Sequence, residues 1–344
     1  MRSSSLARSP ISMPPRANRG SDVVKLATGE KALEKKATRA AFGATLAELA
    51  REGAPVVAVD ADLTGSTTTK KFASADPAFE NRLFNCGIAE QNMVDVAAGL
   101  ALTGHVAYTG SFAVFGTGRA YDQIRNTVCY ANLDVKICPT HAGVSVGPDG
   151  GSHQMLEDVA LMRALPNMRV LVPADYAAAR AAIKLAAATP GPVYVRMGRA
   201  AVPCVYDDDV ELEIGRAYVL REGSDVTIVA CGVEIREALA AADLLAEQGI
   251  SAEVIDAFSV KPLDGETIVA SARKTGAVVT CEEHSVIGGL ASAVAECLAR
   301  TCPTRCEFVG MRDRFGKSGE FEELLSYFEL DAAAIVNAVK RVMA

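Results

Sequence analysis

One glutamate lies where a predicted strand gives way to a helix, and its side chain is suited to acid–base chemistry. Glu90 follows Gly87, which ends the strand, and it opens a helix predicted over 89–103 from the spacing of the apolar residues. Ligands of open α/β sheets bind at such corners. The alternative is a structural role, because a glutamate in the first turn complements the helix dipole by about a few tenths of a kcal/mol. Position alone favours the structural role.

A second group of chemically capable side chains lies in the polar connection 140–154. It contains two of the four histidines of the chain, His141 and His153, together with Asp149. This connection follows the predicted strand 135–138, so it belongs to the edge of the sheet where ligands bind. The alternative is a simple chain reversal at Pro-Asp-Gly-Gly. The concentration of histidines favours a functional loop.

Two further pairs are expected at the same edge. Arg196 and Arg199 end the predicted strand 193–197, and a guanidinium group can bond two oxygens of a phosphate at once. Arginines at strand ends are equally common as solvated residues. Phe112 and Phe115 come between a strand and a helix, where core packing is the default, although such rings can also stack on a planar heterocycle.

These side chains depend on a regular alternation of strands and helices that begins at residue 35. Mostly continuous apolar strands alternating with amphipathic helices are typical of a parallel sheet covered by helices on both faces. The predicted strands of this first domain are 56–60, 106–110, 135–138, 168–172 and 193–197, and the helices are 37–50, 89–103, 117–130, 155–165 and 174–188.

A second alternation follows an interruption that contains Pro203 and three consecutive aspartates. The predicted strands are 226–230, 252–256, 277–281 and 305–309, and the helices are 234–247, 265–274, 289–299, 320–327 and 331–342. The sequence therefore predicts an α/β fold of two doubly wound domains, the second one smaller. The expected divisions are a disordered N-terminal tail (1–34), a first domain (35–200), a solvated linker (201–214) and a second domain (215–344).

Composition excludes several classes of function. A net charge of −7 and a pI near 5.3 argue against nucleic acid as a partner, because binding to phosphate backbones needs a dense basic surface. The apolar runs are too short to cross a membrane. The nine cysteines are scattered singly and do not have the spacing of a zinc site. This pattern is typical of buried thiols in the cytoplasm. The arginines of the tail faintly resemble a transit peptide, although a loose or misassigned N-terminus is the preferred explanation.

Glycine-rich phosphate loops are poorly represented. The turn at residues 116–121 lacks the third glycine of a dinucleotide fingerprint, and the chain has no Walker-type loop. A nicotinamide-dependent Rossmann enzyme is therefore poorly supported.

From residue 35 to its end, the chain resembles the C-terminal half of a transketolase, in the split form in which two polypeptides share the enzyme. The resemblance depends on several motifs in the family's order: F-N-C-G-I-A-E-Q-N-M, S-F-A-V-F, R-A-Y-D-Q-I-R, T-H-A-G-V-S-V-G-P-D-G-G-S-H-Q, P-N-M-R-V-L-V-P-A-D and G-P-V-Y-V-R-M-G-R. It implies a domain that binds the pyrimidine of thiamine diphosphate, followed by a transketolase C-terminal domain.

The resemblance also implies roles for particular residues. Glu90 would be catalytic, hydrogen-bonding N1′ of the aminopyrimidine of the cofactor, and a carboxylic acid suits this role because burial favours its protonated form. Phe112 and Phe115 would pack against the pyrimidine ring. The implied substrate-binding residues, of which the last is also assigned a catalytic role, are Ser66, Arg199, Asp149 and His153.

The chain departs from the family in two places. Fused transketolases have another aromatic residue three positions after the one matched by Phe115, where this chain has Gly118. The Gly-Asp-Gly motif that holds magnesium and the diphosphate is absent. The resemblance therefore implies a partner, an N-terminal transketolase subunit carrying the diphosphate-binding domain, with self-dimerisation inside a heterotetramer.

The implied activity is the transfer of a two-carbon ketol unit from a ketose phosphate to an aldose phosphate, in the pentose phosphate pathway or in a dedicated route for another sugar. Two alternatives remain open. One is the β subunit of a 2-oxoacid dehydrogenase or a deoxyxylulose-phosphate synthase, which share this pair of domains. The other is a transketolase-like binding or regulatory protein without catalysis.

Overall fold

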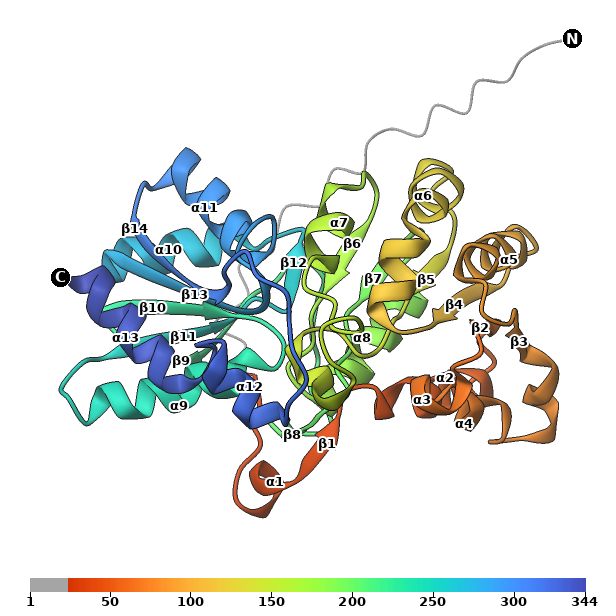
Figure 1. Ribbon diagram of the computed structural model, residues 1–344, viewed down its shortest axis with the longest axis horizontal. Helices are drawn as coiled ribbons and strands as arrows, with labels where there is room; N and C mark the ends of the chain where they lie inside the picture. Colours follow the sequence, from red (N-terminus) through yellow and green to blue (C-terminus); the bar gives the residue numbers. More distant parts are fainter. Residues whose placement is uncertain (1–23) are drawn as a thin grey trace, which may run out of the picture.

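The computed structural model describes residues 24–344, and it contains two parallel-rich sheets that lie side by side (Figure 1). The prediction of two α/β domains is confirmed. The first 23 residues of the predicted disordered tail lie outside the described residues. Residues 24–34 differ from the expectation of disorder, because Leu26 bridges Tyr206 and the short helix α1 (Glu30–Leu33) follows.

The first sheet has seven strands in the order β12-β6-β7-β5-β4-β2-β3. All of its neighbouring strands are parallel except β12, which is antiparallel to β6. In that spatial order the strands are β12 (Ser259–Lys261), β6 (Arg169–Leu171), β7 (Val193–Val195), β5 (Val135–Ile137), β4 (Val106–Gly110), β2 (Val56–Asp60) and β3 (Leu83–Asn85).

Helices cover both faces of this sheet because the strands are apolar on both sides. One face packs against α2 and α8, and the other against α5, η3 and α7. The helical segments are α2 (Ala40–Arg51), α3 (Thr64–Thr67), α4 (Thr69–Ala73), η1 (Pro77–Arg82), α5 (Glu90–Leu102), η2 (Val114–Arg119), α6 (Tyr121–Gln123), η3 (Ile124–Tyr130), η4 (Val144–Asp149), α7 (Asp158–Ala164) and α8 (Tyr176–Ala188).

The second sheet has five strands in the order β14-β13-β10-β11-β9, of which β9 alone is antiparallel to its neighbour. One face packs against α9 and α13, and the other against α10 and α11. The elements are β9 (Tyr218–Arg221), β10 (Val226–Ala230), α9 (Glu234–Ala246), β11 (Ala252–Asp256), α10 (Gly265–Thr275), β13 (Ala277–Ser285), α11 (Leu290–Thr301), β14 (Arg305–Met311), α12 (Phe321–Tyr327) and α13 (Ala332–Met343).

The two domains share their packing. Strand β12 comes from the C-terminal half of the chain, yet it pairs with β6 in the first sheet. Two large apolar clusters each contain residues of both halves. The segment expected to be a solvated linker is also packed: β8 (Ala201–Pro203) pairs with β1 (Lys35–Ala37), and Tyr206 is fully buried with its hydroxyl 2.5 Å from Asp256 Oδ2.

No helix in residues 24–344 is long and apolar enough to cross a membrane.

Candidate active site

Glu90 lies at the carboxyl end of the first sheet, in the corner between β3 and α5. The corner turns at Gly87, whose φ of +67° suits a residue without a side chain. Asn85 Oδ1 fixes the turn by accepting hydrogen bonds from the backbone N–H groups of Gly87 and Asp62, at 3.0 and 3.1 Å. The Glu90 side chain, 2 % exposed, is thus buried in the first turn of α5.

Arg119 contacts Glu90 and was missed by sequence reasoning. Its Nη1 donates to both carboxylate oxygens of Glu90, at 3.0 and 2.9 Å, and its guanidinium carbon lies 4.6 Å from the ring centroid of Phe115. The arginine side chain is half exposed. Arg119 ends η2, a π-helical segment of a kind that is frequent at functional sites. A predicted continuous helix over 117–130 gave no signal for this placement.

The predicted aromatic pair lies in a cluster of four rings. A parallel bridge between Phe112 and Thr140 joins the segments that follow β4 and β5. As a result Phe112 stacks on His141, with ring centroids 3.7 Å apart, and lies 6.1 Å from Phe115. The rings of His153 and Phe115 form a T-shaped pair, with centroids 5.4 Å apart. Of the two phenylalanines, Phe112 is buried, whereas Phe115 is partly open to solvent.

His141 has an environment that holds it in the neutral form. Its backbone has a φ of +61°, which is uncommon for a residue other than glycine. Burial, together with the charges of the nearby Arg39 and Arg199, lowers the pKa of His141 to about 3. Its Nδ1 lies 2.7 Å from Thr140 Oγ1. At neutral pH the ring therefore offers one N–H donor and one acceptor nitrogen.

Two arginines and a serine form a cationic corner beside this cluster. Arg39 Nη1 donates to the carbonyl of Ser66 at 2.9 Å, and Arg199 Nη1 donates to the carbonyl of Val146 at 2.8 Å. Burial lowers the pKa of Arg39, and the neighbouring charge of Arg199 adds to this effect. Two guanidinium groups held near each other suit an anion. Arg39 was not predicted, because it precedes its helix without a recognisable motif.

Arg196 is committed to the interior instead. Its Nε and Nη2 donate to the two carboxylate oxygens of Asp158 at 2.8 and 3.2 Å, and Nη2 also donates to the backbone oxygens of Met155 and Glu283. Both side chains of the ion pair are buried. Of the two arginines predicted at this strand end, Arg199 is therefore the one that remains available to a ligand.

The remaining predicted residues lie on the loop that joins these groups. Asp149 is exposed at the end of η4, and its charge acts on Arg39. His153 is partly exposed, with Nδ1 3.0 Å from Ser152 Oγ. The structure therefore brings His153, Phe112 and Phe115 into contact, and it gathers Ser66, Arg199 and Asp149 around Arg39.

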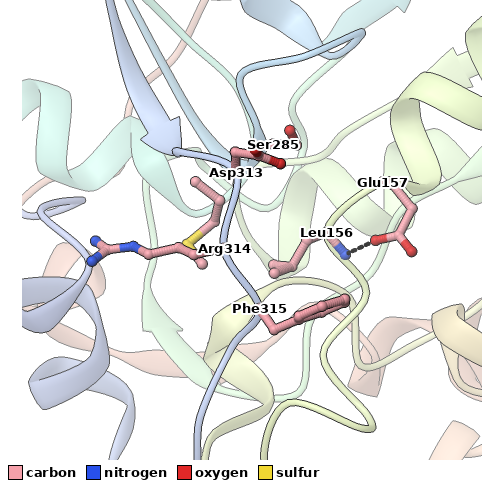
Figure 2. A pocket seen from close by; sticks show the side chains of 7 residues that line it. Leu156, Glu157, Ser285, Asp313, Arg314 and Phe315 are labelled. Carbon is pink, nitrogen blue, oxygen red and sulfur yellow. Dashed lines mark hydrogen bonds between the residues drawn. The ribbon is translucent and has the colours of Figure 1, made fainter.

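A cavity of about 210 Å³ lies outside this region, between the two domains (Figure 2). It is lined by Leu156, Glu157, Ser285, Met311, Asp313, Arg314 and Phe315. None of the predicted site residues lines it.

The side chains at the sheet edge fit the pyrimidine half of thiamine diphosphate. A buried carboxyl group can bond a ring nitrogen, and the partly exposed ring of Phe115 can pack against a heterocycle. Ser111 adds a buried hydroxyl without a hydrogen-bond partner in this structure. No cluster of three or more His, Cys, Asp or Glu in residues 24–344 could hold a metal ion.

Two protein-family models match this chain. The family model for the transketolase pyrimidine binding domain matches residues 34–205, and the model for the transketolase C-terminal domain matches residues 215–335.

Relatives of similar length exist as separate chains. A Methanocaldococcus jannaschii protein named as a transketolase C-terminal section is 47 % identical over 90 % of this chain and 96 % of its own. The 6-deoxy-6-sulfo-D-fructose transketolase subunit SqwH of a Clostridium species is 44 % identical over 91 % and 96 %. A split-gene transketolase, solved as an inactive β4 tetramer, is 51 % identical, with a TM-score of 0.81 over 89 % of this chain and 98 % of that one.

Proposed function

This chain belongs to the transketolase family as the C-terminal subunit of a split enzyme, and we propose that it transfers a two-carbon ketol unit between sugar phosphates once a partner completes its thiamine-diphosphate site. The observation that carries the proposal is the buried Glu90 carboxylate at the start of α5, next to Phe115 and Arg119.

Glu90 would hold a proton at N1′ of the aminopyrimidine, and Phe112 and Phe115 would form one wall of its pocket. When bound, the cofactor would supply a nucleophilic carbon for the reaction with the ketose carbonyl. Arg119 already neutralises Glu90 and would have to share the carboxylate with the pyrimidine. Because Glu90 is buried, its hydrogen bond to N1′ would be shielded from water, which would strengthen that bond.

The cationic corner would bind the phosphate of the sugar. Arg199 and Ser66 were expected in this role, and Arg39, which bonds the Ser66 carbonyl and is affected by the charge of Arg199, adds a third group. Asp149 and His153 would contact sugar hydroxyls, and the neutral ring of His141 could donate one hydrogen bond to the substrate.

The missing half of the site calls for an N-terminal subunit that carries magnesium and the diphosphate-binding domain. The solved relative that forms an inactive β4 tetramer supports this requirement. We propose a cytoplasmic heterotetramer in which two copies of this chain contact each other. The sugar pair stays open between the pentose phosphate pathway and another route, since one relative is named for a sulfonated fructose.

Calorimetric titration of thiamine diphosphate and magnesium would test the cofactor site. We expect binding to the mixture of this chain with its N-terminal partner and none to this chain alone. Absence of binding to the mixture would refute the enzymatic function and favour a regulatory protein. Turnover of the complex on xylulose 5-phosphate rather than pyruvate would separate a transketolase from a 2-oxoacid dehydrogenase subunit.

A further inference from the structure

The loop that carries Asp149 and His153 is hydrogen-bonded to the C-terminal domain. We call residues 143–154 the substrate loop. Glu283, on β13, accepts a hydrogen bond from the backbone N–H of Ser145 and a second one from Ser145 Oγ, the latter at 3.1 Å. Glu283 and Ser145 are 3 % and 2 % exposed. One buried carboxylate of the second domain thus accepts two hydrogen bonds from the substrate loop of the first domain.

The loop backbone passes directly over this carboxylate. Gly143 has a φ of +80°, and a Cβ atom built on it would collide with the carboxyl group of Glu283. Gly143 N also donates to the carbonyl of Met155 at 2.9 Å, which closes the base of the loop. The close approach leaves no room for a side chain at residue 143.

A second segment of the C-terminal domain contacts the far side of the same loop. Gln154 Nε2 donates to the carbonyls of Val144 and Lys317, at 3.1 and 3.0 Å. A Cβ on Gly151 would lie 2.6 Å from the carbonyl oxygen of Gly316. Beyond the loop, Ser285 N donates to the carbonyl of Leu156 at 2.7 Å, and both residues line the cavity in Figure 2.

We propose that Glu283 is a positioning residue of the C-terminal domain, which fixes the substrate loop so that Asp149 and His153 face the sugar. The first part of this proposal, that Glu283 fixes the loop, is supported by contacts within this chain alone. Its effect on the sugar rests on the proposed function. Ser145 lies four residues before Asp149. If Ser145 lost its hydrogen bonds to Glu283, the carboxylate of Asp149 and the ring of His153 would therefore lose their fixed geometry.

The surroundings of Glu283 permit a neutral replacement. Burial raises the pKa of Glu283 to about 7, although Arg196 acts in the opposite direction. Asp158, paired with Arg196, and the buried Glu234 also act on this charge cluster. A glutamine can accept from Ser145 N–H and donate to Ser145 Oγ, so Glu283→Gln should keep the loop in place.

Hydrogen–deuterium exchange of the full chain tests the proposal without any assay of activity. We expect the amides of the substrate loop to exchange at least about tenfold faster in Glu283→Ala, since a buried N–H loses its acceptor. Glu283→Gln should exchange like the wild type. The matched control is Glu253→Gln, a buried glutamate on β11 that bonds Thr227 and Lys274 instead of the loop.

Unchanged loop exchange in Glu283→Ala would overturn the proposal. If this variant does not fold, Glu283→Asp gives the same test, because it withdraws the carboxylate from Ser145 by one methylene group. Loop exchange at the wild-type rate in Glu283→Asp would likewise overturn the proposal.

In the complex with the N-terminal subunit, Glu283→Ala should raise KM for a ketose phosphate about tenfold and leave the Kd of thiamine diphosphate unchanged. An equal loss of cofactor affinity would overturn the positioning role. If the wild-type complex turns over no ketose phosphate, the proposed function fails, while the exchange experiment still decides whether Glu283 holds the loop.

Discussion

Replacing Glu90 by glutamine should remove catalysis while leaving the fold almost intact. Glutamine has nearly the same shape, so the corner between β3 and α5 is preserved. What is lost is a carboxyl group that could hold a proton at the pyrimidine and the charge that pairs with Arg119. The structural and chemical roles of Glu90 therefore predict losses of different size.

The structural loss is small because half of the Arg119 side chain is exposed to water. Ion pairs that reach solvent contribute about 0–1 kcal/mol, and 1 kcal/mol lowers the Tm of a protein of this size by no more than about 2–4 °C. Loss of a positioned acid–base group instead slows a reaction by roughly 10²–10⁴-fold. At about 1.4 kcal/mol per factor of ten, the chemical loss is several times larger than the structural one.

The assay is steady-state ketol transfer by the complex with the N-terminal subunit, accompanied by thermal unfolding of each variant. Arg119→Gln is the matched control, because it breaks the same ion pair and keeps the carboxyl group. We expect Arg119→Gln to lose more stability than Glu90→Gln, because it leaves the buried Glu90 carboxylate without its ion pair, and only Glu90→Gln to lose at least about a hundredfold in kcat. Equal loss of activity in the two variants, or near-normal turnover by Glu90→Gln, would refute the role of Glu90.

The other predictions concern the arginine pair and a buried aspartate. Arg199→Gln should raise KM for a ketose phosphate by about 10–100-fold and leave an unphosphorylated ketose unaffected, and equal losses on both substrates would contradict phosphate binding. Arg196→Gln should instead lower the free energy of unfolding by about 3–5 kcal/mol, because it leaves Asp158 buried and unpaired, and chemical denaturation measures this. Burial raises the pKa of Asp256 to about 7, above about 3.9 in the unfolded chain, so the folded state binds more protons between these values and loses stability as pH rises from about 4 to 7. Asp256→Asn cannot ionise, so its unfolding free energy relative to the wild type should increase over that window by up to ~1.4 kcal/mol per pH unit, and a difference independent of pH would contradict this.

The regular elements were predictable because each depends on its own apolar pattern. The strands β2 and β10 span the predicted residues, 56–60 and 226–230, since both are continuous buried runs. Strand β12 was missed because three residues are too few to show an apolar alternation. They form a strand only because they pair with β6, which is distant in the sequence. The segment 117–130 reads as one helix, but in the structure it is broken into π-helical and α-helical turns.

The candidate site was predictable where motifs lie close together in sequence. Glu90 and the loop from His141 to His153 could be singled out locally. Arg119 and Glu283 could not, because each acquires its partner through a contact between distant segments: Arg119 reaches back 29 residues to Glu90, and Glu283 reaches 138 residues to Ser145. Such pairings follow from the folded topology rather than from local spacing.

The pairing of β12 with β6 joins the two domains through one sheet. A chain shortened to its first domain would leave β6 as an open edge strand, with unpaired N–H and C=O groups that invite association with other molecules. Nascent chains meet this situation as well, because β6 is made well before β12 emerges. The first sheet can therefore be completed only after part of the second domain has been synthesised.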